Sequence, residues 1–172
     1  VTAELLALSP ARVYVPLEEL TAVDTLPAFG GEWCAVLPRI WRDRDEPRLR
    51  ELLVHARELG VTAAGIGNLG HLPLARGLGL RLYGDYGLNV FNARSLTCRR
   101  DRGLESATVS FELRFAQSRD LRKPLPVEAI VYGRLPLMIT ENCLVQNGTG
   151  CRLDRNGPEV PCGGPCRQRH FL

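Results

Sequence analysis

The sequence contains no apolar run long enough to cross a bilayer, and no charged-then-apolar segment stands at its start. These absences predict a protein without a membrane span or a secretory signal, which we expect in the cytoplasm. The chain begins at Val1 in the middle of a helical pattern, "TAELLAL", so we interpret it as a fragment or a processed product.

An excess of charge of either sign is also missing. The 172 residues include 22 basic and 19 acidic side chains, which gives a formal net charge of +3. This balance excludes an acidic tail and is too small to identify a nucleic-acid binder. Two mild basic clusters, at 39–50 and 98–102, are interrupted by acids and are typical of solvated helix faces.

The motifs of the familiar hydrolases are absent. There is no HExxH and no GxSxG, and the three histidines share no spacing that suits a metal ligand set. His55 lies off the apolar stripe of its helix, so we expect it at the surface. The sequence therefore shows no recognisable serine, cysteine or zinc protease machinery.

What the sequence does contain is an alternation of short apolar runs and helical stretches. The predicted strands are 12–17, 33–39, 63–68, 80–86, 106–112 and 127–133. The predicted helices are 46–60, 69–78, 92–102 and 114–123. In the clearest helix, 46–60, the apolar residues fall on one stripe, with Pro47 in the first turn and Gly60 as the stop.

Repeated β-α units of this size build parallel sheets, either doubly wound or closed into a barrel. No glycine-rich phosphate fingerprint opens the first crossover, and "GIGNLG" (65–70) is typical of a tight strand-to-helix turn. We therefore predict an α/β fold that resembles part of a TIM barrel, with about six strands. The barrel-like domain is expected at 1–137 and an irregular cysteine-rich segment at 138–172.

Four of the six cysteines stand in that segment, at Cys143, Cys151, Cys162 and Cys166. The segment is rich in Gly, Pro, Asn and Asp and has few apolar anchors, so burial alone cannot order it. Thiolates in such a loop bind soft metals, and either an iron–sulfur cluster or a structural zinc ion fits four of them. Two disulfides are a weaker alternative, because nothing indicates an oxidising compartment.

The remaining cysteines, Cys34 in a predicted strand and Cys98 on a predicted helix, are interpreted as small buried or half-buried residues. For Cys34 a role as a distant fifth ligand is the minor alternative.

Several longer segments resemble a known family. These are 67–96, "TVSFEL" (108–113) and above all "VEAIVYGRLPLMITENC" (127–143), in which a tyrosine-glycine-arginine strand end leads into "PLM" and a cysteine. They are similar to the peptidase U32 family, the collagenase-like peptidases of unknown catalytic type. The similarity extends from about residue 33 to the end of the chain.

The resemblance implies a TIM-type barrel and an oxygen-sensitive 4Fe-4S cluster, with Cys143, Cys151, Cys162 and Cys166 as its ligands. In some relatives one ligand lies farther downstream. The family is named for the degradation of collagen and peptides. Other relatives support hydroxylation of RNA bases or of a quinone ring without molecular oxygen, with prephenate as an oxygen source.

A protease needs an activated nucleophile or water, and no such constellation is visible, whereas the cluster ligands are present. We therefore predict a cluster-dependent hydroxylation enzyme. The alternatives are a collagenase-like peptidase and a non-catalytic partner subunit with structural zinc. The expected partners are a small-molecule, RNA or peptide substrate and either a partner subunit or the upstream half of the same barrel.

In a barrel, polar residues at the strand ends meet at one rim. The expected substrate-binding residues are Asn68, Asp85, Asn89 and Ser110, with Asn92 beside them, and the expected catalytic residues are Glu112, Tyr132 and Arg134. Arg134 suits an anionic group, or alternatively an ion pair with Glu112 or Glu128. Glu112 is a candidate acid or base, or complements a helix dipole. The alternative for Asp85, Asn89 and Asn92 is that they cap turns.

Overall fold

The computed structural model describes residues 1–136, 139–140 and 170–171. The chain divides into two compact units, Val1–Ile130 and Val131–Leu172, and each is described by itself. None of the helices in these residues combines the length and the hydrophobicity that a membrane span requires.

The first unit is built on a six-stranded parallel sheet. Its strands are β1 (Arg12–Pro16), β2 (Glu32–Val36), β3 (Ala63–Ile66), β4 (Arg81–Gly84), β5 (Ser106–Thr108) and β6 (Val127–Glu128). They lie side by side in chain order, which is the arrangement of a (β/α) barrel and differs from a doubly wound sheet, whose strand order reverses.

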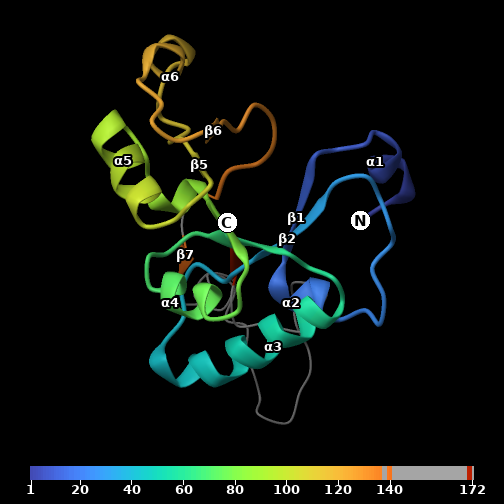
Figure 1. The fold of residues 1–172 in the computed structure, drawn as a ribbon. Coiled ribbons are helices and arrows are strands. Elements are labelled where there is room, and N and C mark those ends of the chain that lie inside the picture. The colour runs from blue at the N-terminus through green and yellow to red at the C-terminus, as the bar shows by residue number, and fades with distance from the viewer. Residues whose placement is uncertain (137–138, 141–169, 172) are drawn as a thin grey trace, which may run out of the picture. The chain divides into compact units, whose positions relative to one another are not determined.

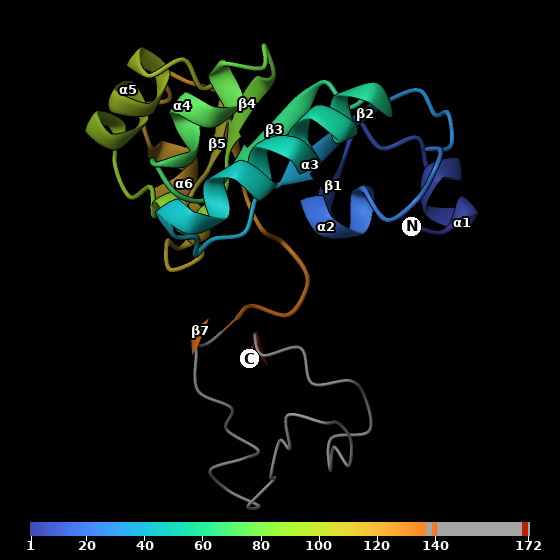
Figure 2. The same ribbon diagram turned by 90° about the horizontal axis from the view of Figure 1, so that it is seen from below.

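Helices and helical turns connect the strands (Figure 1). They are α1 (Ala3–Ala7), α2 (Leu17–Leu20), η1 (Asp43–Asp45), α3 (Glu46–Glu58), α4 (His71–Arg76), η2 (Tyr86–Leu88), α5 (Ala93–Asp101) and α6 (Phe115–Asp120). In Figure 2, α2, α3 and α4 lie along one side of the strands. The predicted alternation and the partial barrel are confirmed.

Helix α3 shows how the sequence produces these elements. Pro47 stands in its first turn, where a missing N–H costs nothing, and Gly60 follows its end with a left-handed φ of 92°. Leu49, Leu53 and Ala56 share one face and are buried against the sheet. The apolar stripe that predicted the helix is therefore the face that it packs.

The two faces of the sheet differ in chemistry because side chains alternate along a strand. On β1, Val13 and Val15 belong to the main aliphatic core beneath the helices. Arg12 and Tyr14 therefore lie on the opposite, inner face. On β2, Cys34 likewise leaves the main core and packs in a separate small cluster on this inner face.

The sheet is curled, and its two outermost strands meet through their side chains. Arg12 Nη1 on β1 lies 2.8 Å from Glu128 Oε1 on β6, and the Tyr14 hydroxyl donates to Glu128 Oε2 at 2.7 Å. In a flat sheet, five steps of about 4.8 Å would separate β1 and β6 by about 24 Å, beyond the reach of these side chains. The first unit is thus a curled half-barrel with an inner concave face.

In the second unit, β7 (Ile139–Thr140) pairs with β8 (His170–Phe171) in antiparallel orientation. The predicted ligands Cys143, Cys151, Cys162 and Cys166 lie outside the described residues.

Candidate functional site

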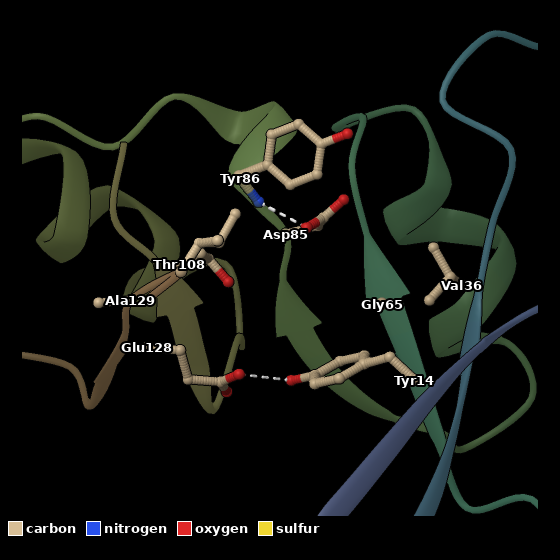
Figure 3. A pocket seen from close by; sticks show the side chains of 9 residues that line it. Tyr14, Val36, Gly65, Asp85, Tyr86, Thr108, Glu128 and Ala129 are labelled. Atoms are coloured by element: carbon tan, nitrogen blue, oxygen red, sulfur yellow. Dashed lines mark hydrogen bonds between the residues drawn. The ribbon is translucent and has the colours of Figure 1, made fainter. Parts of the chain in front are cut away.

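A pocket of about 280 Å³ opens on the inner face of the half-barrel (Figure 3). It is lined by Tyr14, Val36, Gly65, Asp85, Tyr86, Thr108, Glu128, Ala129 and Ile130. Every one of the six strands contributes a lining residue from within itself or from the residues that directly follow it. Most of these stand at the carboxyl ends of the strands, which is where (β/α) barrels place their active sites.

A glycine on β3 provides much of the space in this pocket. A Cβ at Gly65 would lie 3.5 Å from Val36 Cγ2 and 3.7 Å from Tyr14 Cδ1, which is ordinary van der Waals contact. A methyl group therefore fits without strain, whereas a longer side chain at this position would extend into the pocket. Residue 65 is consequently a place where the volume of the pocket can be changed by mutation.

Asp85 is the carboxyl group at the centre of the site. It follows β4 and caps η2, where its Oδ1 accepts a hydrogen bond from the Tyr86 backbone N–H at 2.7 Å. Burial raises the pKa of Asp85 and the charge of Glu128 adds to this, while the Tyr86 hydrogen bond and the Arg39 charge oppose it. The net rise brings this carboxyl closer to the range in which it can both accept and give a proton.

Beneath Asp85, a charged cluster that we call the Arg12 clasp holds β1, β2 and β6 together; it comprises Arg12, Tyr14, Glu32 and Glu128. Arg12 donates from Nε to Glu32 at 3.1 Å and from Nη1 to both Glu128 and the Tyr14 hydroxyl, at 2.8 and 2.9 Å. Its guanidinium carbon also lies 3.3 Å from the centroid of the Tyr83 ring. Arg12 thus bridges two carboxylates on the inner face, and Arg81 forms a second ion pair with one of them, Glu32.

The clasp also fixes protonation states. Burial and the hydrogen bond to Glu128 raise the pKa of Tyr14, so its hydroxyl stays protonated and donates. Burial acts to raise the pKa of Glu32 as well, but hydrogen bonds from Thr62 and Arg12 outweigh it and the net pKa is lowered. Glu32 therefore remains an anion, which the basic end of Arg81 also contacts.

Of the predicted site residues, Asp85 alone among the described ones lines the pocket. Asn68 is exposed and its Oδ1 accepts from the Gly70 N–H at 2.9 Å, which forms a local turn. Asn89 ends η2 with a left-handed φ of 48°, and Asn92 caps α5 by accepting from the Ser95 N–H at 2.9 Å.

Two more predicted residues follow β5. Ser110 is buried, and its hydroxyl accepts from the Glu112 N–H at 3.3 Å. Glu112 itself is exposed, and no other described residue forms an ion pair with it. Tyr132, which is 97% exposed, and Arg134 belong to the second unit.

The sequence reasoning did not find Tyr14, Glu128 or Tyr86 as pocket residues. A signal for the first was available: in "RVYVP", Arg12 and Tyr14 alternate with two valines, which places a charged and an aromatic side chain on the non-core face. Glu128 carries no such signal, because its role depends on the curl that brings β6 to β1.

The two described cysteines are not placed as nucleophiles. Cys34 is fully buried in the small cluster with Ala63 and Tyr83, and burial raises the pKa of its thiol, so it stays protonated. Cys98 is half-buried on α5. The prediction that these two cysteines are buried or half-buried is confirmed.

The histidines also lie apart from the pocket. The exposure predicted for His55 is confirmed, with 46% of its side chain accessible. His71 is fully buried beside Trp41, at a ring centroid distance of 5.8 Å, and neither ring nitrogen has a partner at hydrogen-bond geometry. Burial lowers the pKa of His71 to about 4, and the nearby Pro38 carbonyl offsets only part of this. Within the described part of the chain, no group of three or more His, Cys, Asp or Glu side chains is arranged to hold a metal ion.

The fold and the pocket define a protein of the (β/α)-barrel class with a site at the carboxyl ends of its strands. Residues 16–172 match the family model described as Peptidase family U32, so the chain belongs to that family. A search of curated proteins and a search of solved structures each found no match.

Proposed function

We propose that this chain is the barrel-bearing part of an iron–sulfur-dependent enzyme that hydroxylates a ring, such as an RNA base or a quinone-like ring, without molecular oxygen. Membership of the U32 family is compatible with this chemistry and with peptide hydrolysis. The choice between them rests on the lining of the pocket.

The pocket has the properties of a site for a single ring. Its volume of about 280 Å³ lies just below the range of small-molecule sites, about 300–1,000 Å³. The aromatic side chains of Tyr14 and Tyr86 flank the space from β1 and from η2 (Figure 3). Asp85 stands between them with a raised pKa. Aromatic walls and one proton-exchanging carboxyl are what a planar, hydrogen-bonding ring requires.

The same lining does not support covalent peptide hydrolysis. Among the residues that the structure describes, no cysteine, serine or histidine lines the pocket, and the hydroxyl of Thr108, which does, has no hydrogen bond to a described base. A nucleophilic peptidase needs such a residue with a base beside it. Cys34 is buried in a small cluster with Ala63 and Tyr83, and His71 is buried beside Trp41.

Peptide hydrolysis through water is the second candidate function. Asp85 and Glu128 both line the pocket, and a pair of carboxyls can activate water. However, both carboxylate oxygens of Glu128 already accept hydrogen bonds within the protein, Oε1 from Arg12 and Ser106 and Oε2 from Tyr14. We therefore favour a single acid–base group, Asp85, over a carboxyl pair.

The donor set of the second unit fits an iron–sulfur cluster. Cys143, Cys151, Cys162 and Cys166 offer four thiolates, which are the soft ligands that such clusters use. When bound, the cluster would supply electron transfer, and the alternative occupant of the same thiolates is a structural zinc ion. In the described part of the chain, Asp85 would hold or move a proton at its carboxyl, and Glu128 would hold the Tyr14 ring in place at the base of the pocket by accepting from its hydroxyl.

The proposal is tested in cells from which the gene has been deleted, complemented with the wild type or with variants. Nucleosides and quinones are compared by mass spectrometry after anaerobic growth. We expect wild type to restore one hydroxylated species, and Asp85→Asn to lower its formation at least about a hundredfold, the usual contribution of an acid–base group. Gly65→Leu is expected to abolish it by filling the pocket, and Gly65→Ala to retain most of it.

The peptidase alternative is followed in parallel by cleavage of fluorescent gelatin and casein with purified protein. Cleavage that persists in a Cys143→Ala variant and is lost in Asp85→Asn would support hydrolysis and overturn the hydroxylation proposal.

A further inference from the structure

Arg39 lies just after the end of β2 and beside the wall of the pocket. Its guanidinium carbon is 5.6 Å from the centroid of the Tyr86 ring. Its charge is near enough to lower the pKa of Asp85 against the effect of burial. The side chain is exposed and does not itself line the pocket, but it contacts Tyr86, which does.

The local backbone leaves room for this guanidinium through a glycine. A Cβ at Gly87 would lie 3.3 Å from Arg39 Nε and 2.7 Å from the Gly67 carbonyl oxygen. A Cβ at Gly67 would in turn lie 3.6 Å from Asp85 Oδ2. Arg39, two side-chain-free backbone positions and Asp85 therefore surround the same part of the rim.

No carboxylate within 4 Å neutralises Arg39 in the part of the chain that the structure describes. This contrasts with Arg12 and Arg81 on the inner face, which both form ion pairs with Glu32. Arg39 thus contacts the Tyr86 side chain beside a ring-sized pocket but forms no ion pair with a carboxylate of the described residues. A guanidinium in this position matches the geometry of a carboxylate or a phosphate.

We propose that Arg39 binds an oxyanion carried by the molecule in the pocket, so that the ligand is a ring with a carboxylate or phosphate substituent. The inference rests on the proposed function only in taking this pocket as the substrate site. It narrows the substrate class, since a neutral ring would give this guanidinium no anionic partner.

In this arrangement, the binding of an anion at Arg39 is coupled to the protonation of Asp85. Burial and the charge of Glu128 raise the pKa of Asp85, whereas the hydrogen bond from the Tyr86 N–H and the charge of Arg39 lower it. The nearby thiol of Cys34 stays protonated and adds no charge. An anion at Arg39 cancels its charge, and the pKa of Asp85 then rises further. Binding consequently takes up protons, and affinity for a probe that is ionised throughout increases as the pH falls through the pKa of Asp85.

The test uses three probes that share one ring: benzoate, phenyl phosphate and the neutral benzamide. Dissociation constants are measured on the full chain by ligand-observed NMR. We expect at least one anion to bind about tenfold or more tightly than benzamide, as for a charged hydrogen-bonded pair. Arg39→Gln should remove this difference, and which anion is preferred distinguishes carboxylate from phosphate.

Arg44→Gln is the matched control, because it removes one positive charge from the same β2–α3 connection at a side chain that is 72% exposed. It should leave the preference unchanged. Gly65→Leu should weaken all three probes, and Asp85→Asn should abolish the part of the pH dependence of anion binding that exceeds the titration of the probe itself. The inference is overturned if neither anion binds, if benzamide binds as well as the anions, or if Arg44→Gln weakens them as much as Arg39→Gln does.

Failure of the anion-binding inference can be distinguished from failure of the proposed function. Arg39-dependent anion binding in a protein that hydroxylates nothing would refute the proposed function and leave the anion site established. Hydroxylation by a protein that shows no preference for anions would support the proposed function and refute the anion site.

Discussion

At the scale of single residues, His71 shows how burial sets a charge state. Its ring is fully enclosed beside Trp41 with both nitrogens unpartnered, and burial lowers its pKa to about 4. The unfolded chain has an ordinary histidine pKa of about 6.5. Between these values the unfolded state binds more protons, so the free energy of unfolding rises with pH across this window.

We predict that this one group lowers the free energy of unfolding by about 2 kcal/mol between pH 7 and pH 5. The measurement is urea denaturation at both pH values for wild type and for His71→Leu, in which this component should disappear. His55→Gln, at an exposed histidine, should behave as wild type. Equal pH dependence in wild type and His71→Leu would contradict the assigned burial effect.

At the scale of elements, α3 is the helix whose packing the structure defines best. Leu53 is fully buried on its core face, while Val54, the next residue, is 40% exposed. We expect Leu53→Ala to lower the free energy of unfolding by about 3 kcal/mol through lost burial and a cavity. Val54→Ala should change it by less than about 0.5 kcal/mol. Similar losses for the two variants, measured by urea denaturation, would show that α3 does not pack on this face.

Most elements could be predicted from the sequence because their signals are local. α3 has its stripe, its proline and its glycine, and the observed strands fall within or one residue outside the predicted ranges. Several strands are shorter than predicted. β6, for example, spans only Val127–Glu128. A strand forms hydrogen bonds only along the length of its neighbour, and the neighbour of β6, β5, has only three residues. The short helix α2 was missed, since it directly follows Pro16 and has only four residues.

The candidate site was predictable only in part. Asp85 was found because it stands at a strand end, which is a local property. Tyr14 and Glu128 are 114 positions apart and meet only through the curl of the sheet, which no local pattern encodes. The contact between them, and hence the base of the pocket, required the structure.

At the scale of the whole first unit, the Arg12 clasp joins the two outermost strands of the half-barrel. Its members are sheltered to different degrees: 22% of the Arg12 side chain, 33% of Glu128 and 9% of Glu32 are accessible, and Tyr14 is 40% exposed. Removal of Arg12 would leave Glu128 without its ion-pair partner, whereas Glu32 would keep only Arg81. This is the situation in which loss of one partner costs far more than the pair contributes.

We predict that Arg12→Met lowers the free energy of unfolding by about 2 kcal/mol and weakens probe binding in the pocket, because Tyr14 and Glu128 lose their common partner. The control is Arg48→Met, whose ion pair with Glu18 is exposed on both sides and should be worth less than about 0.5 kcal/mol. Urea denaturation measures both. Equal effects would mean that the clasp does not hold the strands together.

The central claim is that this family member combines its barrel pocket with an iron–sulfur cluster on the four cysteines of the second unit. The most direct measurement is the content of iron, acid-labile sulfide and zinc in anaerobically purified protein. We expect a brown protein with about four irons and four sulfides per chain, both lost in Cys143→Ala and both retained in Cys98→Ala. A colourless protein with one zinc ion and no iron would contradict the account.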